Sequence, residues 1–380
     1  MTTIHRRELL LGTCALGASA SMPWASGCED DARESEVLRG PLWASAQGAE
    51  VGSYSLVVAG PDRVHARIAS EVRGHGMAVD PARPERVVMF GRRPERSGII
   101  GDIRTGEVVA EFEAAAGHHH CGHGAFSADG SLLFVVEAGD VTGKSFIAVF
   151  DAHSMERQGE LDGYGVGPHQ MLLMPDGNTL ALANGGLLTE PGGRDPINLQ
   201  TMRSSLVYID STTGALISEH TVPEPKASLR HLAVADDGTV AVCMQVQREA
   251  LTDTDPRPLL AVHRPGEALK VFEDGLEVGT AMEDYAASVA ICSHARIAAV
   301  TSPRGNLIAF WNVDTGALEG MQRFDDVSGA EVTADDGRFV FTGSNGQVRM
   351  TDGDTLEEQP ESRTRFSDVL WDNHLLTIPV

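Results

Sequence analysis

Short runs of alternating apolar and polar residues recur along the chain, and turn residues bound each run. One phrase combines a histidine, an alternating apolar run and a polar turn, and its four copies are His75–Pro81 (HGMAVDP), His123–Gly130 (HGAFSADG), His169–Gly177 (HQMLLMPDG) and His231–Gly238 (HLAVADDG). Apolar residues at every second position predict half-buried strands rather than helices. The Asp, Pro and Gly residues that follow predict tight connections to the next strand.

A second phrase marks the other end of most repeats. It consists of an apolar strand, an Asp and a turn of the Thr-Gly type, as in IGDIRTGEVV, AVFDAHSMERQGE, VYIDSTTGALI and FWNVDTGALEG. Strand, turn and strand in this order are typical of a β-hairpin. Three further copies of the first phrase lack the histidine at that place and begin near Ser288, Ala330 and Phe366.

The repeat length predicts the architecture. The four histidines are 48, 46 and 62 residues apart along the chain, which is close to the length of a four-stranded propeller blade. The last repeat has only two strands before the chain stops, while two strands at 53–59 and 63–68 precede the first repeat. Pairing them would close the ring and remove exposed edges. We therefore predict one all-β, seven-bladed β-propeller over residues 41–380.

Composition supports the β-rich fold, and the net charge excludes some classes of binding partner. Aromatic residues make up 5% of the chain while glycine occurs 41 times, which favours many short strands. The formal net charge is −24, and such a field repels nucleic acids and anionic lipid surfaces. We therefore expect no nucleic-acid partner and, in the mature chain, no transmembrane segment.

The first 28 residues have the pattern of an export signal. Arg6 and Arg7 precede an apolar run of small residues that ends near Ala20, as in a twin-arginine signal. Cleavage could follow Ala20, or a lipoprotein-type site could lead to lipidation of Cys28. We expect a periplasmic protein in which residues 29–40 form a charged linker. Because this route exports folded proteins, it is compatible with a cofactor inserted before export.

Four histidines occupy equivalent places in four consecutive repeats. The first strand of a propeller blade lines the central channel, so residues at its start should converge on one channel mouth. This reasoning predicts a histidine-rich metal site formed by His75, His123, His169 and His231. Imidazole suits iron, copper, zinc or nickel better than calcium or magnesium. The alternative is that each histidine bonds neighbouring loop carbonyls and was inherited by duplication.

The stretch GHHHCGHG adds further candidate ligands beside this site. His118 and His119 would arrive from the loop that enters the second blade, and Cys121 could be a soft ligand. Glu137, at the end of LLFVVE, could supply a carboxylate or lie at a solvated blade edge. The other two cysteines of the mature repeats, Cys243 and Cys292, are expected to be buried in apolar strands.

A long insertion at 184–205 explains the 62-residue spacing and is expected to lie over one face of the propeller. Long ordered loops are often functional, and Arg194 and Arg203 could bind an anion there, or form plain salt bridges. No G-x-S-x-G elbow, H-E-x-x-H or C-x-x-C motif occurs in the chain. An enzymatic activity is therefore weakly supported.

Several phrases together resemble one bacterial protein family. The phrases are GHGAFSADGSLLFVVE, GVGPHQMLLMPDGNTLALANGG, NLQTMRSSLVYID, SLRHLAV, TSPRGN and the terminal WDNHL. The chain is similar to exported propeller proteins encoded near imelysin-like and di-haem oxidoreductase-like proteins, in gene clusters linked to iron acquisition. The resemblance implies a periplasmic seven-bladed propeller that handles a metal such as iron, with matching histidines at His123, His169 and His231. No enzymatic activity is attached to that family.

The chain departs from the family pattern at two places. Gln170 stands where the family has an acidic residue, and His120 with Cys121 stands where the family has an aromatic one. The resemblance therefore transfers the fold more readily than the identity of the metal. Our leading hypothesis is a metal-binding accessory or chaperone of a periplasmic metal-uptake system, with the exported proteins of that system as partners. The alternatives are a metal-free platform for protein interactions and a metal-dependent oxidase or lactonase-like hydrolase.

Overall fold

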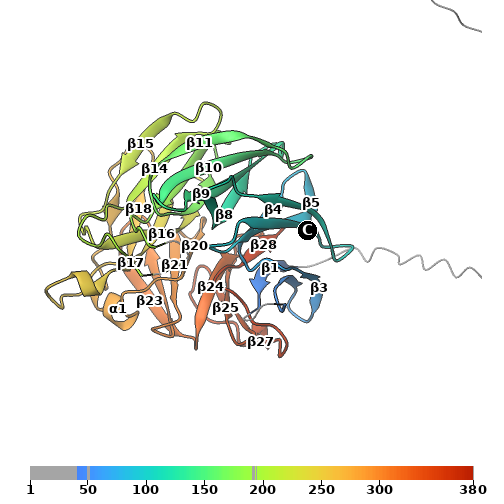
Figure 1. The fold of residues 1–380 in the computed structure, drawn as a ribbon. Helices are drawn as coiled ribbons and strands as arrows, with labels where there is room; N and C mark the ends of the chain where they lie inside the picture. Colours follow the sequence, from blue (N-terminus) through green and yellow to red (C-terminus); the bar gives the residue numbers. More distant parts are fainter. Residues whose placement is uncertain (1–40, 49–51, 191–192, 194, 380) are drawn as a thin grey trace, which may run out of the picture. The chain divides into compact units, whose positions relative to one another are not determined.

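Seven four-stranded antiparallel sheets form a ring, and they account for nearly all the regular structure (Figure 1). The fold is taken from a computed structural model, which describes residues 41–48, 52–190, 193 and 195–379. The only α-helix in these ranges is α1 (Leu276–Ala281), and Arg248–Ala250 and Pro360–Ser362 form single 3-10 turns. The seven-bladed propeller is therefore confirmed.

Each of the first six blades is continuous in sequence and runs from an inner to an outer strand. Blades 1 to 3 are β4 (Gly74–Asp80), β5 (Arg83–Gly91), β6 (Ser97–Asp102) and β7 (Glu107–Glu113); β8 (His118–Phe126), β9 (Leu132–Gly139), β10 (Lys144–Asp151) and β11 (Arg157–Val166); and β12 (Pro168–Leu173), β13 (Thr179–Asn184), β14 (Ser205–Asp210) and β15 (Leu216–His220). Blades 4 to 6 are β16 (Ala227–Val234), β17 (Val240–Val246), β18 (Leu260–His263) and β19 (Lys270–Val271); β20 (Ser288–Cys292), β21 (Ile297–Ser302), β22 (Leu307–Asn312) and β23 (Leu318–Arg323); and β24 (Val327–Val332), β25 (Arg338–Gly343), β26 (Gln347–Asp352) and β27 (Thr364–Arg365).

Blade 7 joins the two ends of the propeller. Its inner strand is β28 (Leu376–Ile378), and β1 (Leu42–Gln47), β2 (Ser55–Ala59) and β3 (Val64–Ala69) complete it from the N-terminal side. Closure by N-terminal strands was expected, but the expected split of two strands from each end was wrong. The strand β1 escaped notice because its residues, LWASAQ, are almost all buried and show no alternation of apolar and polar positions.

Aspartate and asparagine side chains set the recurring hairpin turns. The Oδ1 atom of Asp210 accepts hydrogen bonds from the backbone N–H groups of Thr212 and Thr213, at 3.1 and 2.7 Å. The same arrangement occurs at Asp102, Asp151, Asn312 and Asp352. A short polar side chain that bonds its own backbone two or three residues on favours a tight turn. The second repeated phrase therefore marks the connection between the third and fourth strands of five blades.

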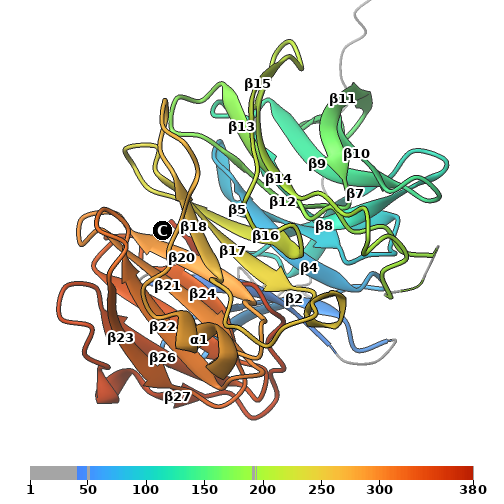
Figure 2. The same cartoon turned by 90° about the vertical axis from the view of Figure 1, so that its left-hand side faces the viewer.

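Apolar side chains fill the space between neighbouring blades. Phe90 of blade 1, for example, packs in one cluster with Leu133 and Val135 of blade 2. Each inner strand contacts the inner strands of the blades on both sides, from β28 through β4 and round to β24. Figure 2 shows β4, β8 and β12 running side by side. The inner strands thus surround a common central space.

The N-terminal expectations fall outside the described residues. They are the signal segment 1–28, lipidation at Cys28 and the linker 29–40. Within the described part of the chain, no helix combines the length and the apolar character needed to cross a bilayer.

Candidate metal centre

Four of the inner strands contain a bulge at their histidine. The strand register shifts between Gly74 and Met77 around His75, and between Pro168 and Met171 around His169. Equivalent shifts occur around His123 in β8 and His231 in β16. A bulge inserts an extra residue, which breaks the alternation of faces and re-aims a side chain. Of the inner strands without a histidine, β20 keeps a continuous register, whereas β24 has a shift between Val327 and Gly329.

The four histidines converge as the repeat predicted, and a fifth joins them. His374, from the loop before β28, lies with its ring centroid 4.4 Å from that of His75 and 4.4 Å from that of His231. Ring centroids of neighbouring members of the cluster are 4.4 to 6.4 Å apart. We call His75, His123, His169, His231 and His374 the histidine cluster. Its members come from five consecutive blades, 7 and 1 to 4.

The spacing of the ring nitrogens fits shared coordination of one ion. The Nε2 atoms of His169 and His231 are 3.2 Å apart, a hydrogen-bond distance, and so are those of His75 and His374. Two imidazole nitrogens bound to one tetrahedral zinc ion are about 3.4 Å apart. His123 belongs to two groups of three histidines whose ligand atoms all lie within 4.8 Å of one another. Its Nε2 atom is buried without a hydrogen-bond partner among the described residues.

Burial holds the histidine cluster in the neutral form. Desolvation is the main cause that lowers the pKa of His75, and it lowers the pKa of the other four members well below the usual value of 6.5. Repulsion between neighbouring imidazolium charges adds to this effect. Neutral imidazole is the form that binds metal ions. The cluster is therefore ready to act as a ligand set at neutral pH.

Asp372 connects the cluster to a second layer of polar groups. Its Oδ2 atom lies 3.6 Å from Nδ1 of His75, and Arg92 donates from Nη1 to both carboxylate oxygens at 3.0 and 3.1 Å. Burial opposes ionisation of Asp372, but the interactions with His75 and Arg92 lower its pKa overall. A carboxylate behind a histidine typically fixes the ring orientation and tautomer at a metal site.

Two glycines allow the histidines to approach each other. A Cβ atom at Gly76 would lie 2.7 Å from Nδ1 of His123, and one at Gly122 would lie 2.6 Å from Cδ2 of His75. Gly122 also has a φ of +86°, which L side chains rarely adopt. The Gly-His-Gly phrases are thus explained by close packing of the imidazoles.

The structure places His118 and Glu137 apart from the histidine cluster. His118 donates or accepts through Nδ1 with Oε2 of Glu137 at 3.0 Å, and its ring stacks on Phe146. Glu137 is 0% exposed and is held by Arg157, whose Nη1 and Nη2 donate to its two oxygens at 2.7 and 3.1 Å. Both alternatives considered for Glu137, a funnel ligand and a solvated edge, overlooked this buried ion pair.

His119 and Cys121 line a pocket beside the cluster but belong to no group of potential ligands. Nδ1 of His119 lies 2.9 Å from Oδ1 of Asp140. Burial raises the pKa of the Cys121 thiol to about 12, so a metal-binding thiolate is disfavoured. Cys243 and Cys292 are both 0% exposed, as expected of cysteines in apolar strands.

The two arginines considered for anion binding contribute little to the site. Arg203 is exposed and lies 3.2 Å from Glu219, a plain salt bridge, and Arg194 is outside the described residues.

Cys292, His294 and Asp336 form another group of potential metal ligands. Burial raises the pKa of the Cys292 thiol to about 11, and the thiol donates to the Asp336 carbonyl oxygen at 3.0 Å. A protonated thiol disfavours metal binding by this group.

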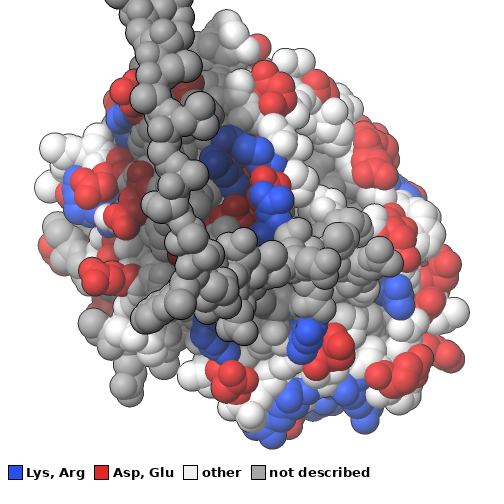
Figure 3. Space-filling model, turned by 90° about the vertical axis from the view of Figure 1, so that its right-hand side faces the viewer, with Lys and Arg blue, Asp and Glu red and all other residues white. Residues whose placement is uncertain are grey.

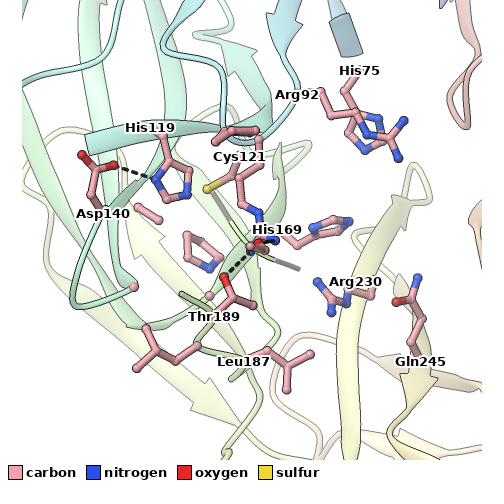
Figure 4. A pocket seen from close by; sticks show the side chains of 18 of the residues that line it. His75, Arg92, His119, Cys121, Asp140, His169, Leu187, Thr189, Arg230 and Gln245 are labelled. Atoms are coloured by element: carbon pink, nitrogen blue, oxygen red, sulfur yellow. Dashed lines mark hydrogen bonds and ion pairs between the residues drawn. The ribbon is translucent and has the colours of Figure 1, made fainter. Parts of the chain in front are cut away.

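The pocket beside the cluster has a volume of about 260 Å³ and is reached by three of its histidines, His75, His169 and His231. Figure 4 shows His169 and Arg230 directed toward the same space, with His119 on the opposite wall. In Figure 3, acidic and basic side chains are both spread over the face that is shown, and several basic side chains lie together with acidic ones in a central hollow. The pocket itself is lined by both imidazole and guanidinium groups, among them those of His169, His231 and Arg230.

Comparisons with known proteins support the fold and define the family. The hydrazine synthase of Kuenenia stuttgartiensis has a similar solved structure, with a TM-score of 0.63 and 15% sequence identity over 80% of this chain and 90% of that chain. At this identity the likeness shows the fold alone. No curated protein matches the chain. A family model described as a protein of unknown function, DUF1513, matches residues 68–378. Because this match covers most of the chain, the protein belongs to the DUF1513 family.

Proposed function

We propose that the propeller binds one transition-metal ion through the histidine cluster and acts as an accessory or chaperone in metal acquisition in the periplasm. The observation that carries this proposal is the convergence of five neutral imidazoles from five blades, four of them buried and that of His169 half-buried, with two Nε2 pairs separated by 3.2 Å. Four of these imidazoles come from consecutive neighbouring blades, and the fifth, that of His374, reaches them because blade 7 closes the ring.

A purely structural role explains this arrangement poorly. Buried polar atoms in proteins nearly always have hydrogen-bond partners, yet His123 Nε2 and His231 Nδ1 have none among the described residues. Burying these nitrogens without hydrogen-bond partners also costs free energy on folding. A metal ion would satisfy the unpaired nitrogens that face it and offset part of this cost.

The donor set favours a borderline transition metal. The two overlapping groups contain imidazole nitrogens only, which suit iron, copper or zinc rather than magnesium or calcium. Iron and copper are the metals we propose first, and the resemblance to propellers of iron-linked gene clusters supports iron. Asp372 would hold His75 in the orientation that presents Nε2 to the ion.

The cellular role rests on the sequence rather than on the geometry of the site. The twin-arginine pattern of the first 28 residues supports export, and the family resemblance supports a place among the exported proteins of a metal-uptake system. Those proteins are the partners we propose. The acidic net charge of −24 is consistent with a partner other than nucleic acid.

Elemental analysis of protein purified from its exported compartment tests the metal. We expect about one transition-metal ion per chain. X-ray absorption at the metal edge should show only nitrogen or oxygen neighbours at about 2.0–2.1 Å, with no sulfur at about 2.3 Å. Metal-free protein that takes up none of iron, copper or zinc would overturn the proposal.

A further inference from the structure

Arg230 is a half-buried cation without a partner among the described residues. It follows Leu229 on β16 and directly precedes His231, within the same bulge. Its side chain forms no hydrogen bond or ion pair with any other residue in the described part of the chain, and its Nε atom is buried. Burial, the main cause, lowers its pKa to about 10. An Nε–H group that is buried without an acceptor carries a desolvation cost, which an anionic ligand in the pocket would offset.

The other charged groups of the pocket are already engaged. Arg92 is held by Asp372, and Arg93 donates to the hydroxyl of Thr189 and to a backbone carbonyl in the insertion at 3.1 and 2.8 Å. Asp140 is paired with His119. Glu190 also lines the pocket, but it is exposed. The chain has 54 acidic residues, and none of those described forms an ion pair with Arg230.

The pocket around Arg230 has both polar and apolar walls. Leu187, Leu188 and Pro94 line it together with Arg230 and His169. Figure 4 shows the Arg230 guanidinium turned toward the space that His169 borders, with Leu187 on another side. A planar guanidinium matches a carboxylate through two parallel N–H···O bonds. Apolar walls suit the carbon skeleton that an organic acid has and an inorganic anion lacks.

We propose that this pocket binds a small organic carboxylate, which Arg230 holds beside the histidine cluster. One cation with unused donors suits a single carboxylate group better than a phosphate dianion, which would need more positive charge than the engaged Arg92 and Arg93 leave available. The inference rests on the proposed function in one respect, because the carboxylate would then lie next to the metal and complete its surroundings with an anion.

Calorimetric titration of propionate, a monocarboxylate with an apolar tail, into the full-length protein, as purified and after metal removal, tests the site. Wild-type protein should bind about one propionate, and R230Q should bind it about 10-fold to 100-fold more weakly, as expected for loss of a charge-assisted pair. R203Q is the matched control, because Arg203 is an exposed arginine that is paired with Glu219; it should bind like wild type. R230K, which keeps the charge but loses the fork, should be intermediate.

R230Q should fold, because no described residue depends on Arg230 for a hydrogen bond or an ion pair; its melting temperature should be close to that of wild type. Binding of propionate that is unchanged in R230Q, or absent from wild type, would overturn the proposal. Phosphate that competes as well as propionate would overturn the assignment to a carboxylate.

Metal content measured on the same samples separates the two proposals. A metal-free protein that binds propionate through Arg230 would contradict only the metal function, whereas a metal-loaded protein whose propionate binding is unchanged in R230Q would contradict only the carboxylate site.

Discussion

The Nε2 atoms of His75 and His374 lie 3.2 Å apart, although 299 residues separate the two histidines along the chain. The contact exists because β28 is the inner strand of blade 7 and lies beside β4 of blade 1. Closure of the ring therefore does more than protect sheet edges. It brings the last member of the histidine cluster, His374, to the other four, so metal binding by all five histidines would depend on closure of the ring.

Asp372 should be a positioning residue for the metal site. D372N retains the shape of the side chain but removes the charge that faces His75 at 3.6 Å. Loss of a carboxylate behind a histidine ligand typically weakens metal affinity by about 10-fold to 100-fold. Competition with a chromophoric chelator would measure this change. D368N is the control, because Asp368 is exposed and pairs only with Arg67; equal affinities in the two variants would contradict the assigned role.

Gly122 should be required for metal affinity beyond its effect on the backbone. G122A and G106A both place an alanine at a positive φ, +86° and +74°, which costs about 1 kcal/mol in each case. A Cβ atom at Gly106 meets nothing within 4 Å, whereas one at Gly122 lies 2.6 Å from the His75 ring. Only G122A should therefore weaken metal binding. Urea unfolding and metal titration of both variants test this, and normal affinity in G122A would argue against a tightly packed cluster.

The metal-free protein should lose stability as the pH falls below about 6.5. The folded state holds the pKa of each histidine in the cluster below 6.5, so in this range the unfolded chain binds protons that the folded chain does not. Stability rises with pH wherever the unfolded state binds more protons. Below pH 6.5, each histidine lowers the free energy of unfolding by up to about 1.4 kcal/mol for each unit that the pH falls. Above pH 6.5, its effect on the free energy of unfolding no longer changes with pH.

Urea unfolding at a series of pH values down to about 5 measures this slope. H123Q should reduce the slope of unfolding free energy against pH by up to about 1.4 kcal/mol per pH unit, the value for one proton. The reason is that it removes one of the titrating groups without adding a charge. H153Q, which replaces an exposed histidine outside the cluster, should leave the slope unchanged. A free energy of unfolding that does not change across this pH range would show that the imidazoles are protonated normally in the folded state.

Glu137 should matter for stability and not for metal content. E137Q leaves the Arg157 guanidinium without its main partner, and breaking a buried pair costs about 3–5 kcal/mol. The metal-to-protein ratio of the folded variant should equal that of wild type. Thermal unfolding and elemental analysis provide the two readouts. A variant of normal stability that has lost its metal would restore Glu137 as a ligand.

The repeat made the fold and most of the cluster predictable. Turn residues such as Asp210 and Gly214 recur at fixed places, because tight hairpins need a side-chain acceptor and a positive φ. His75, His123, His169 and His231 were found because each precedes a turn by a similar short stretch of residues. Equivalent positions in a closed ring must converge, so a purely local pattern carried long-range information.

The remaining features depend on contacts that leave no local pattern. His374 precedes a strand of only three residues and has no turn after it, so it did not match the repeat. Its one signal was the terminal WDNHL phrase. Glu137 ends an uninterrupted apolar run, and its partner Arg157 arrives from another strand of the blade. Arg230 was likewise hidden, because the absence of a partner can be recognised only in three dimensions.

The most direct test of the account is the metal-to-protein ratio of wild-type, H123A and H153A proteins, each loaded with iron, copper or zinc and then desalted. His123 belongs to both groups of potential ligands, whereas His153 is exposed and lies in a turn. The account predicts about one ion per chain in wild type and H153A, and little or none in H123A at an unchanged fold. An H123A protein that remains folded and retains a full ion would contradict a metal site at the histidine cluster.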